Sequence, residues 1–161
     1  MNLFRPIEIE HEARCAAPPA AAWATLVEIE RWPDWYPHVH AVRPVPDIGG
    51  AWPQLQEGAT WEEEVHRGPF KPRLQATVLE LVEGEALTWE ARHLGVTGWH
   101  TWHVDRTDNG CRLSDRYVFS GPGWRLVAAR LLLVLFRVKA QGQRQIDAWA
   151  RRAEKLGPNV E

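Results

Sequence analysis

The sequence predicts an α+β domain in which a curved antiparallel sheet of six to seven strands packs around one long C-terminal helix. Three observations lead to this prediction. Short alternating segments with turn signals between them follow one another over residues 59–120. A helical apolar period then covers about 122–156, and two short helical segments separate the first strand from the second. Because the apolar face of a sheet must be covered, we expect the long helix to pack on it.

The first strand is predicted over residues 6–15, PIEIEHEARC, where side chains alternate between two faces. One face is charged, and the other is apolar except for His11. Pro18 and Pro19 follow, and proline is favoured in the first turn of a helix, so AAAWATLVEIE is predicted to be helical. The segment RWPDWYP at 31–37 is interrupted by proline and predicts at most a second short helix.

Five further strands are predicted in succession, each separated from the next by a turn signal. Their segments are ATWEEEVHRG (59–68), RLQATVLELV (73–82), EALTWEARHL (85–94), TGWHTWHVDR (97–106) and CRLSDRYVFS (111–120). Short connections between successive strands predict an antiparallel meander. The long helix then ends at Gly157-Pro158, and Gly142 in its middle predicts a bend.

Length, charge and cysteine content restrict the class of protein. With 161 residues, one domain over 1–161 is expected. A net charge of −2 offers no general attraction to nucleic acid. The N-terminus has no signal-peptide pattern, and Cys15 and Cys111 have no metal spacing, so we expect reduced thiols in a cytoplasmic protein. The absence of a Gly-rich phosphate loop or a metal-ligand motif predicts no cofactor and no metal.

Tryptophan content and one apolar run are unusual. Ten tryptophans would crowd a solid core of this size, and they fit better as the lining of a cavity or an interface. The run LVAARLLLVLF at 126–136 is too short to span a membrane. It predicts either a peripheral contact with a membrane or a protein partner, or burial under the proline-rich loops, and the sequence leaves both open.

Three stretches carry a family resemblance: CAAPPAAAW (15–23), ERWPDWYPHVHAV (30–42) and GWHTWHVDRTDNGCRLSDRYVFSG (98–121). Together with the order of elements over 6–156, they make the chain resemble the START-like (SRPBCC) superfamily, the polyketide cyclase/dehydrase and lipid transport group with the helix-grip fold. The resemblance implies a hydrophobic cavity between sheet and C-terminal helix, where family members bind lipids, sterols, polyketides, quinones or hormones. Some members catalyse cyclisation or dehydration, but no catalytic motif is universal, so the fold does not define the activity.

The phase of the strands predicts which side chains face this cavity, because cross-strand partners share a face. The LGVTG turn is expected to pair His93 with His100 and Ala91 with Trp102. His100 and Trp102 would then look inward, whereas Trp99 would look outward. A register error of one residue would reverse this assignment.

The next turn and the family resemblance supply further pairings. The TDNG turn is expected to place Trp102 opposite Asp115 and His100 opposite Tyr117. The resemblance implies that the first strand pairs with the last, which puts His11 beside Asp115 and brings the two cysteines close together.

The candidate ligand-binding residues are the inward aromatic and polar side chains and a helical lid over them. They are Trp61, Glu63, Trp89, His93, His100, Trp102, Asp115 and Tyr117, with Leu131, Leu135 and Val138 as the lid. A few polar groups in an apolar pocket are typical of a binding site. Plain core packing is the alternative for the tryptophans.

Asp115 is the most informative of these positions, because a carboxylate on an apolar strand face is costly unless it is paired. It could orient His11 or His100 as a general base, or it could form a structural pair with His11 or with the Trp102 N–H. His11, His100 and Asp115 are therefore the catalytic candidates. Zinc would need ligands from three strands with no H-x-x-H spacing, so no metal site is predicted among them.

Three functions remain as alternatives at this point. The first is binding of a hydrophobic small molecule, either a lipid or a polyketide- or quinone-like compound, in a tryptophan-lined cavity. The second is a polyketide cyclase, aromatase or dehydratase whose cavity His/Asp pair acts as acid and base. The third is a ligand-free protein-interaction module that uses the apolar helix surface.

Overall fold

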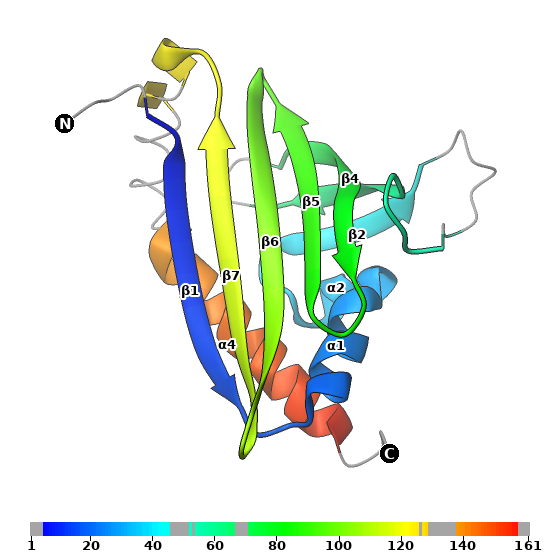
Figure 1. The fold of residues 1–161 in the computed structure, drawn as a ribbon. Coiled ribbons are helices and arrows are strands. Elements are labelled where there is room, and N and C mark those ends of the chain that lie inside the picture. Colours follow the sequence, from blue (N-terminus) through cyan, green and yellow to red (C-terminus); the bar gives the residue numbers. More distant parts are fainter. Residues whose placement is uncertain are drawn as a thin grey trace.

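The computed structural model describes residues 5–45, 52, 54–66, 71–125, 127–128 and 138–157. Seven antiparallel strands form one sheet in the order β1-β7-β6-β5-β4-β3-β2. Figure 1 shows the sheet curving around the helices α1 and α4, which lie on one of its faces. We call this the inner face. The predicted α+β class, the meander and the two short helices after the first strand are confirmed.

The strands are β1 (Ile7–Cys15), β2 (Val39–Pro44), β3 (Thr60–Val65), β4 (Arg73–Val82), β5 (Ala86–His93), β6 (Val96–Thr107) and β7 (Gly110–Ser120). The helices are α1 (Pro19–Val27), the 3-10 turn η1 (Ile29–Arg31), α2 (Trp32–Trp35) and α4 (Val138–Leu156). No side-chain hydrogen bond caps α1, which begins at the predicted proline turn.

The C-terminal helix packs on the sheet through one stripe. Ile146, Trp149, Ala150 and Ala153 recur at helical spacing on α4 and are buried. Trp149 Nε1 donates to Ala22 O at 3.0 Å and so joins α4 to α1. Before α4, the predicted helix at 122–156 is described only at 122–125 and 127–128, and all of these residues except Pro122 are helical. Leu131 and Leu135 lie outside the described residues, as does the side chain of Val138.

Both pairings predicted for β7 are confirmed. On β1, His11 lies opposite Asp115 and Cys15 opposite Cys111, and both thiols are free and buried. On β6, His100 lies opposite Tyr117 and Trp102 opposite Asp115. The inward assignment of His100 and Trp102 therefore holds, and both are buried.

The pairing predicted for the β5–β6 hairpin is wrong. His93 lies opposite Val96, four positions before His100, because the chain reverses through two residues only. These residues, Leu94 and Gly95, both have positive φ (49° and 74°), the conformation of the tight turn that matches strand twist. A register shift by an even number of residues keeps every side chain on the same face of the sheet, so His100 and Trp102 still face inward. His93 itself, however, is exposed at the end of its strand.

Tryptophans fill the centre of the inner face. The ring of Trp32 lies between 5.1 and 5.7 Å, centroid to centroid, from the rings of Trp61, Trp89 and Trp102. Trp102 in turn stacks on Trp149 of α4 at 4.9 Å. These rings are almost fully buried, so around them the structure shows the core packing that the sequence had left as an alternative. We call these five rings the tryptophan cluster.

Candidate functional site

Three titratable side chains meet beside the tryptophan cluster, on three neighbouring strands. The register of β1, β7 and β6 brings His11, Asp115 and His100 together on the inner face. All three are buried, and Asp115 is only 2% exposed. A buried carboxylate requires partners, and both of its oxygens have them.

Asp115 is held by hydrogen bonds on each oxygen. His11 Nδ1 lies 2.7 Å from Oδ1, and Gln145 Nε2 donates to Oδ2 at 3.3 Å. Burial raises the pKa of Asp115, but the neighbouring His100 and His11 lower it more, so the net pKa lies below the usual value. Asp115 is therefore ionised at neutral pH, and His11 donates its Nδ1–H to it.

His100 has two contacts that exclude one another. Its Nε2 accepts a hydrogen bond from Trp102 Nε1, and an indole N–H can only donate, so this contact requires neutral His100 with no proton on Nε2. The same Nε2 lies 3.7 Å from Asp115 Oδ2, beyond ordinary hydrogen-bond distance. A proton on Nε2 would let His100 donate to the carboxylate, at the cost of the Trp102 bond. While His100 accepts the Trp102 hydrogen bond, His11 is the histidine that bonds directly to Asp115.

A chain of hydrogen bonds links Asp115 to two phenols. Tyr117 OH donates to Gln145 Oε1 at 2.9 Å, and Tyr36 OH lies 3.0 Å from Tyr117 OH. Since Tyr117 gives its proton to Gln145, Tyr36 donates to Tyr117. Every donor in this chain points toward the Asp115 carboxylate, which polarises each bond in the same direction. Tyr117 is only half-buried, and its ring stacks on His100 at 3.6 Å.

Helix α4 contributes two residues that the sequence reasoning missed or read differently. Gln145 was missed, although it lies four residues before Trp149, on the stripe that faces the sheet. Gly142, expected to bend the helix, lies against the His11 imidazole. A Cβ at this position would be 2.1 Å from His11 Cε1, so only glycine lets ring and helix approach. Tyr36 was also missed, because its segment carried only turn signals.

The remaining candidates do not join this group. Trp61 and Trp89 belong to the tryptophan cluster, and buried Glu63 lies on β3, separated from β7 by three strands. Because His93 is exposed at the β5–β6 turn, the three histidines and Asp115 do not converge on one point.

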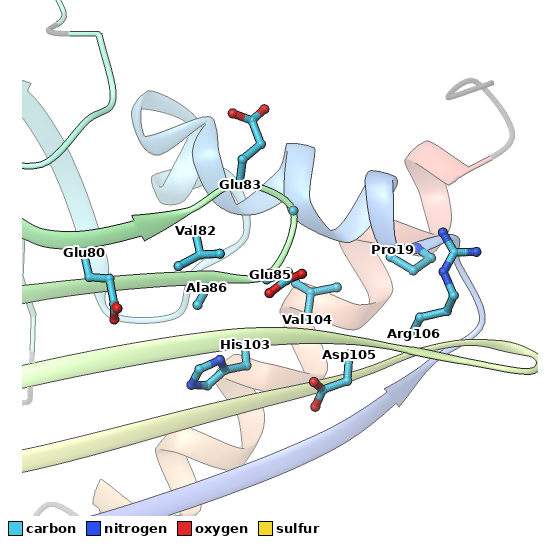
Figure 2. Close-up of a pocket in the computed structure, with 11 residues that line it drawn as sticks. Pro19, Glu80, Val82, Glu83, Glu85, Ala86, His103, Val104, Asp105 and Arg106 are labelled. Atoms are coloured by element: carbon cyan, nitrogen blue, oxygen red, sulfur yellow. The ribbon is translucent and has the colours of Figure 1, made fainter.

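A hollow of about 670 Å³ opens where the β4–β5 turn and β6 approach the start of α1. Figure 2 shows that acidic side chains surround it, among them Glu80, Glu83, Glu85 and Asp105. None of the residues lining this hollow was a candidate, and it has no contact with the His11–Asp115 pair. Among the residues that the structure describes, no helix is long and apolar enough to span a bilayer.

Comparison with known sequences places the chain in a family. A sequence model of the polyketide cyclase / dehydrase and lipid transport family matches residues 6–154, and the chain therefore belongs to this family. The START-like resemblance drawn from the sequence is confirmed. A search of curated proteins found no match.

Solved structures share the fold at low sequence identity. The aromatase/cyclase Zhui from Streptomyces sp. R1128 matches with a TM-score of 0.75 and 15% identity over 94% of this chain and 96% of its own. The di-domain aromatase/cyclase StfQ of the steffimycin pathway matches with a TM-score of 0.75 and 14% identity over 96% of this chain, which spans about half (52%) of StfQ.

A plant enzyme has the same architecture. Norcoclaurine synthase from Thalictrum flavum, in complex with dopamine and hydroxybenzaldehyde, matches with a TM-score of 0.66 and 17% identity over 99% of this chain and 92% of its own. At these identities the likeness establishes the helix-grip fold and nothing about the ligand.

Proposed function

We propose that the protein binds a hydrophobic small molecule with one or more oxygen-bearing rings, of the polyketide- or quinone-like class. The site would lie on the inner face beside the tryptophan cluster, against Tyr117 and Phe119. The single observation that carries this proposal is Tyr117, whose ring is half-buried while its hydroxyl is oriented by a buried chain of hydrogen bonds. An oriented polar group on an apolar wall is typical of a small-molecule site.

The side chains around Tyr117 favour a flat, aromatic ligand. Phe119 is half-buried and its ring is nearly parallel to that of Tyr117, with an interplanar angle of 4°. Gly98 has no side chain, so the Phe119 ring lies close against the β6 backbone. Trp35 stacks on Tyr36, and its buried Nε1 has no hydrogen-bond partner among the described residues. A ligand oxygen would satisfy this donor, since buried donors are seldom left unpaired.

Two of the structural relatives agree with this ligand class. Zhui is an aromatase/cyclase, and the norcoclaurine synthase structure holds dopamine and hydroxybenzaldehyde, both of which are aromatic. Leu131, Leu135 and Val138 remain predicted lid residues for such a ligand.

The proposal is tested by isothermal titration calorimetry with a hydroxylated anthraquinone, preceded by native mass spectrometry of the purified protein. Tyr117→Phe removes only the hydroxyl and should weaken binding roughly 5- to 10-fold, the value of one hydrogen bond. Trp99→Phe is the control, because Trp99 lies on the opposite face of β6 and should leave the affinity unchanged. No binding by the wild type, with no compound recovered, would instead favour the ligand-free interaction module.

Acid–base catalysis is the second candidate, and the His11–Asp115 hydrogen bond with His100 beside it is the observation that favours it. In a cyclisation of the aldol type, neutral His100 would accept the proton of a CH₂ group next to a carbonyl. The carbanion would then attack a second carbonyl, and the imidazolium, steadied by Asp115, would return the proton to the new alkoxide. The Trp102 N–H would lose its acceptor during this step and regain it afterwards.

Turnover of a poly-β-ketone substrate separates this candidate from binding alone. Asp115→Asn and His100→Ala should abolish product formation, while calorimetry still detects the anthraquinone. If both variants form product at the wild-type rate, acid–base catalysis by this group is excluded.

A further inference from the structure

Two histidines and a glutamate gather on the outer face of the sheet, away from the proposed ligand site. His40 of β2 and Glu64 of β3, with His66 directly after β3, lie close enough that one ligand atom from each falls within 4.8 Å of the others. The imidazoles of His40 and His66 stack at 4.2 Å, and His66 Nε2 lies 2.8 Å from Glu64 Oε1. Side chains of these types are the ones that bind zinc.

A β-bulge brings His40 to this position. Val39 lies opposite Val65 and Ala41 lies opposite Glu64, so His40 is the extra residue between two ladder pairs. Bulges turn a side chain out of the regular alternation and are common beside functional sites. The backbone N–H of His66 donates to the carbonyl of His38 at 2.7 Å, which holds the two strand ends together at the cluster.

Two arginines orient the glutamate for a metal ion. Arg43 Nη1 and Arg73 Nε lie 3.6 and 3.5 Å from Glu64 Oε2, which leaves Oε1 directed at His66. The second oxygen of Glu64 is thus fixed by outer partners, as is usual for metal ligands.

We propose that His40, Glu64 and His66 form a binding site for one divalent transition-metal ion of the zinc class. Three protein ligands leave at least one position for water or another small ligand. The metal would take the place of the direct contact between His66 Nε2 and Glu64 Oε1. Ligand atoms about 2.0–2.1 Å from a tetrahedral ion are roughly 3.3 Å apart, so Glu64 and His66 must separate slightly while the exposed His40 closes in.

The alternative is a surface network of ion pairs in which His66 and the arginines only neutralise Glu64. That alternative gives His40 no role. It also predicts no preference between zinc and magnesium, whereas a site with two imidazoles selects zinc, because magnesium prefers oxygen ligands and keeps its waters.

Isothermal titration calorimetry with ZnCl₂ on protein free of any polyhistidine tag tests the proposal. The wild type should bind one Zn²⁺ per chain, and MgCl₂ should give no heat of binding. His40→Ala, His66→Ala and Glu64→Gln should each weaken zinc binding at least 10-fold. His103→Ala is the matched control, an exposed histidine on β6 whose removal should leave the affinity unchanged.

Replacement of zinc by Co²⁺ provides a second readout, since intense visible bands indicate tetrahedral coordination with protein ligands. These bands should appear in the wild type and disappear in His66→Ala. The proposal is overturned if the wild type binds no zinc at millimolar concentration, or if zinc binds equally to the wild type and to the three ligand variants. Loss of binding in His103→Ala would also overturn it, by locating the ion elsewhere.

Discussion

Asp115 shows how one buried charge can be stabilised by its neighbours. Its carboxylate receives hydrogen bonds from His11 and Gln145, and Gln145 is itself held by Tyr117. Removing one partner from such a group leaves the others unsatisfied, so the cost exceeds that of a single surface hydrogen bond.

Asp115→Asn should lower the free energy of unfolding by about 1–3 kcal/mol at pH 7. The pKa of Asp115 is lowered in the folded state below the usual value of 3.8, so the unfolded chain binds the proton more readily. The stabilisation from Asp115 is therefore present above about pH 4 and is lost as the pH falls through the folded-state pKa. Urea unfolding at a series of pH values from 7 to 3 measures this. The wild type should lose stability more steeply with acid than the variant, and parallel curves would contradict the prediction.

Helix α4 is positioned against β1 by the contact between Gly142 and His11. Glycine in the middle of a helix costs roughly 1 kcal/mol relative to alanine, and here its lack of a side chain makes room for the imidazole. The helix thereby carries Gln145 to the Asp115 carboxylate. Gly142 therefore has a packing role, which the sequence could not reveal without knowing which strand lies beneath the helix.

Gly142→Ala should destabilise the protein by about 1–3 kcal/mol, because the new Cβ displaces the His11 ring from Asp115. In a His11→Ala background the same substitution should be neutral or stabilising by up to about 1 kcal/mol, because the space is empty. Urea unfolding of the wild type, both single variants and the double variant gives the coupling energy. Equal effects of Gly142→Ala in both backgrounds would show that the contact carries no energy.

Across the whole molecule, the tryptophan cluster fills the middle of the inner face. Trp32, from the short helix α2, fills the centre and packs on rings from β3, β5 and β6. Its indole N–H donates to Leu26 O at 2.9 Å, which ties α2 to the end of α1. The half-buried rings of Tyr117 and Phe119 lie beyond this packed region, toward the end of β7.

Trp32→Ala should cost about 3–5 kcal/mol, because the cavity left among four rigid rings cannot collapse. Trp124→Ala is the control, since Trp124 is 69% exposed, and its effect should stay within about 0.5 kcal/mol. Thermal and urea unfolding compare the two variants. A loss below 1 kcal/mol for Trp32→Ala would mean that the cluster is loosely packed.

The sequence by itself determined the fold class, the order of the strands and the face of each inward residue. These depend on local information, because alternation has a period of two and turn residues restrict register, so His100, Trp102 and Asp115 could be assigned to one face. The pairing of the first strand with the last, which puts His11 beside Asp115, was implied by the family resemblance. Even the four-residue error at the β5–β6 turn left the faces unchanged.

Only the tertiary structure decided which side chains complete each group. Gln145 of α4 reaches Asp115, and Tyr36, directly after α2, reaches Tyr117. His93 is excluded from the group because two residues with positive φ make the β5–β6 turn tight. His40 joins Glu64 and His66 through a bulge that breaks the regular alternation. The physical reason is the same in each case. Periodicity orients a side chain within its own element, whereas contacts between elements depend on how closely the backbones approach.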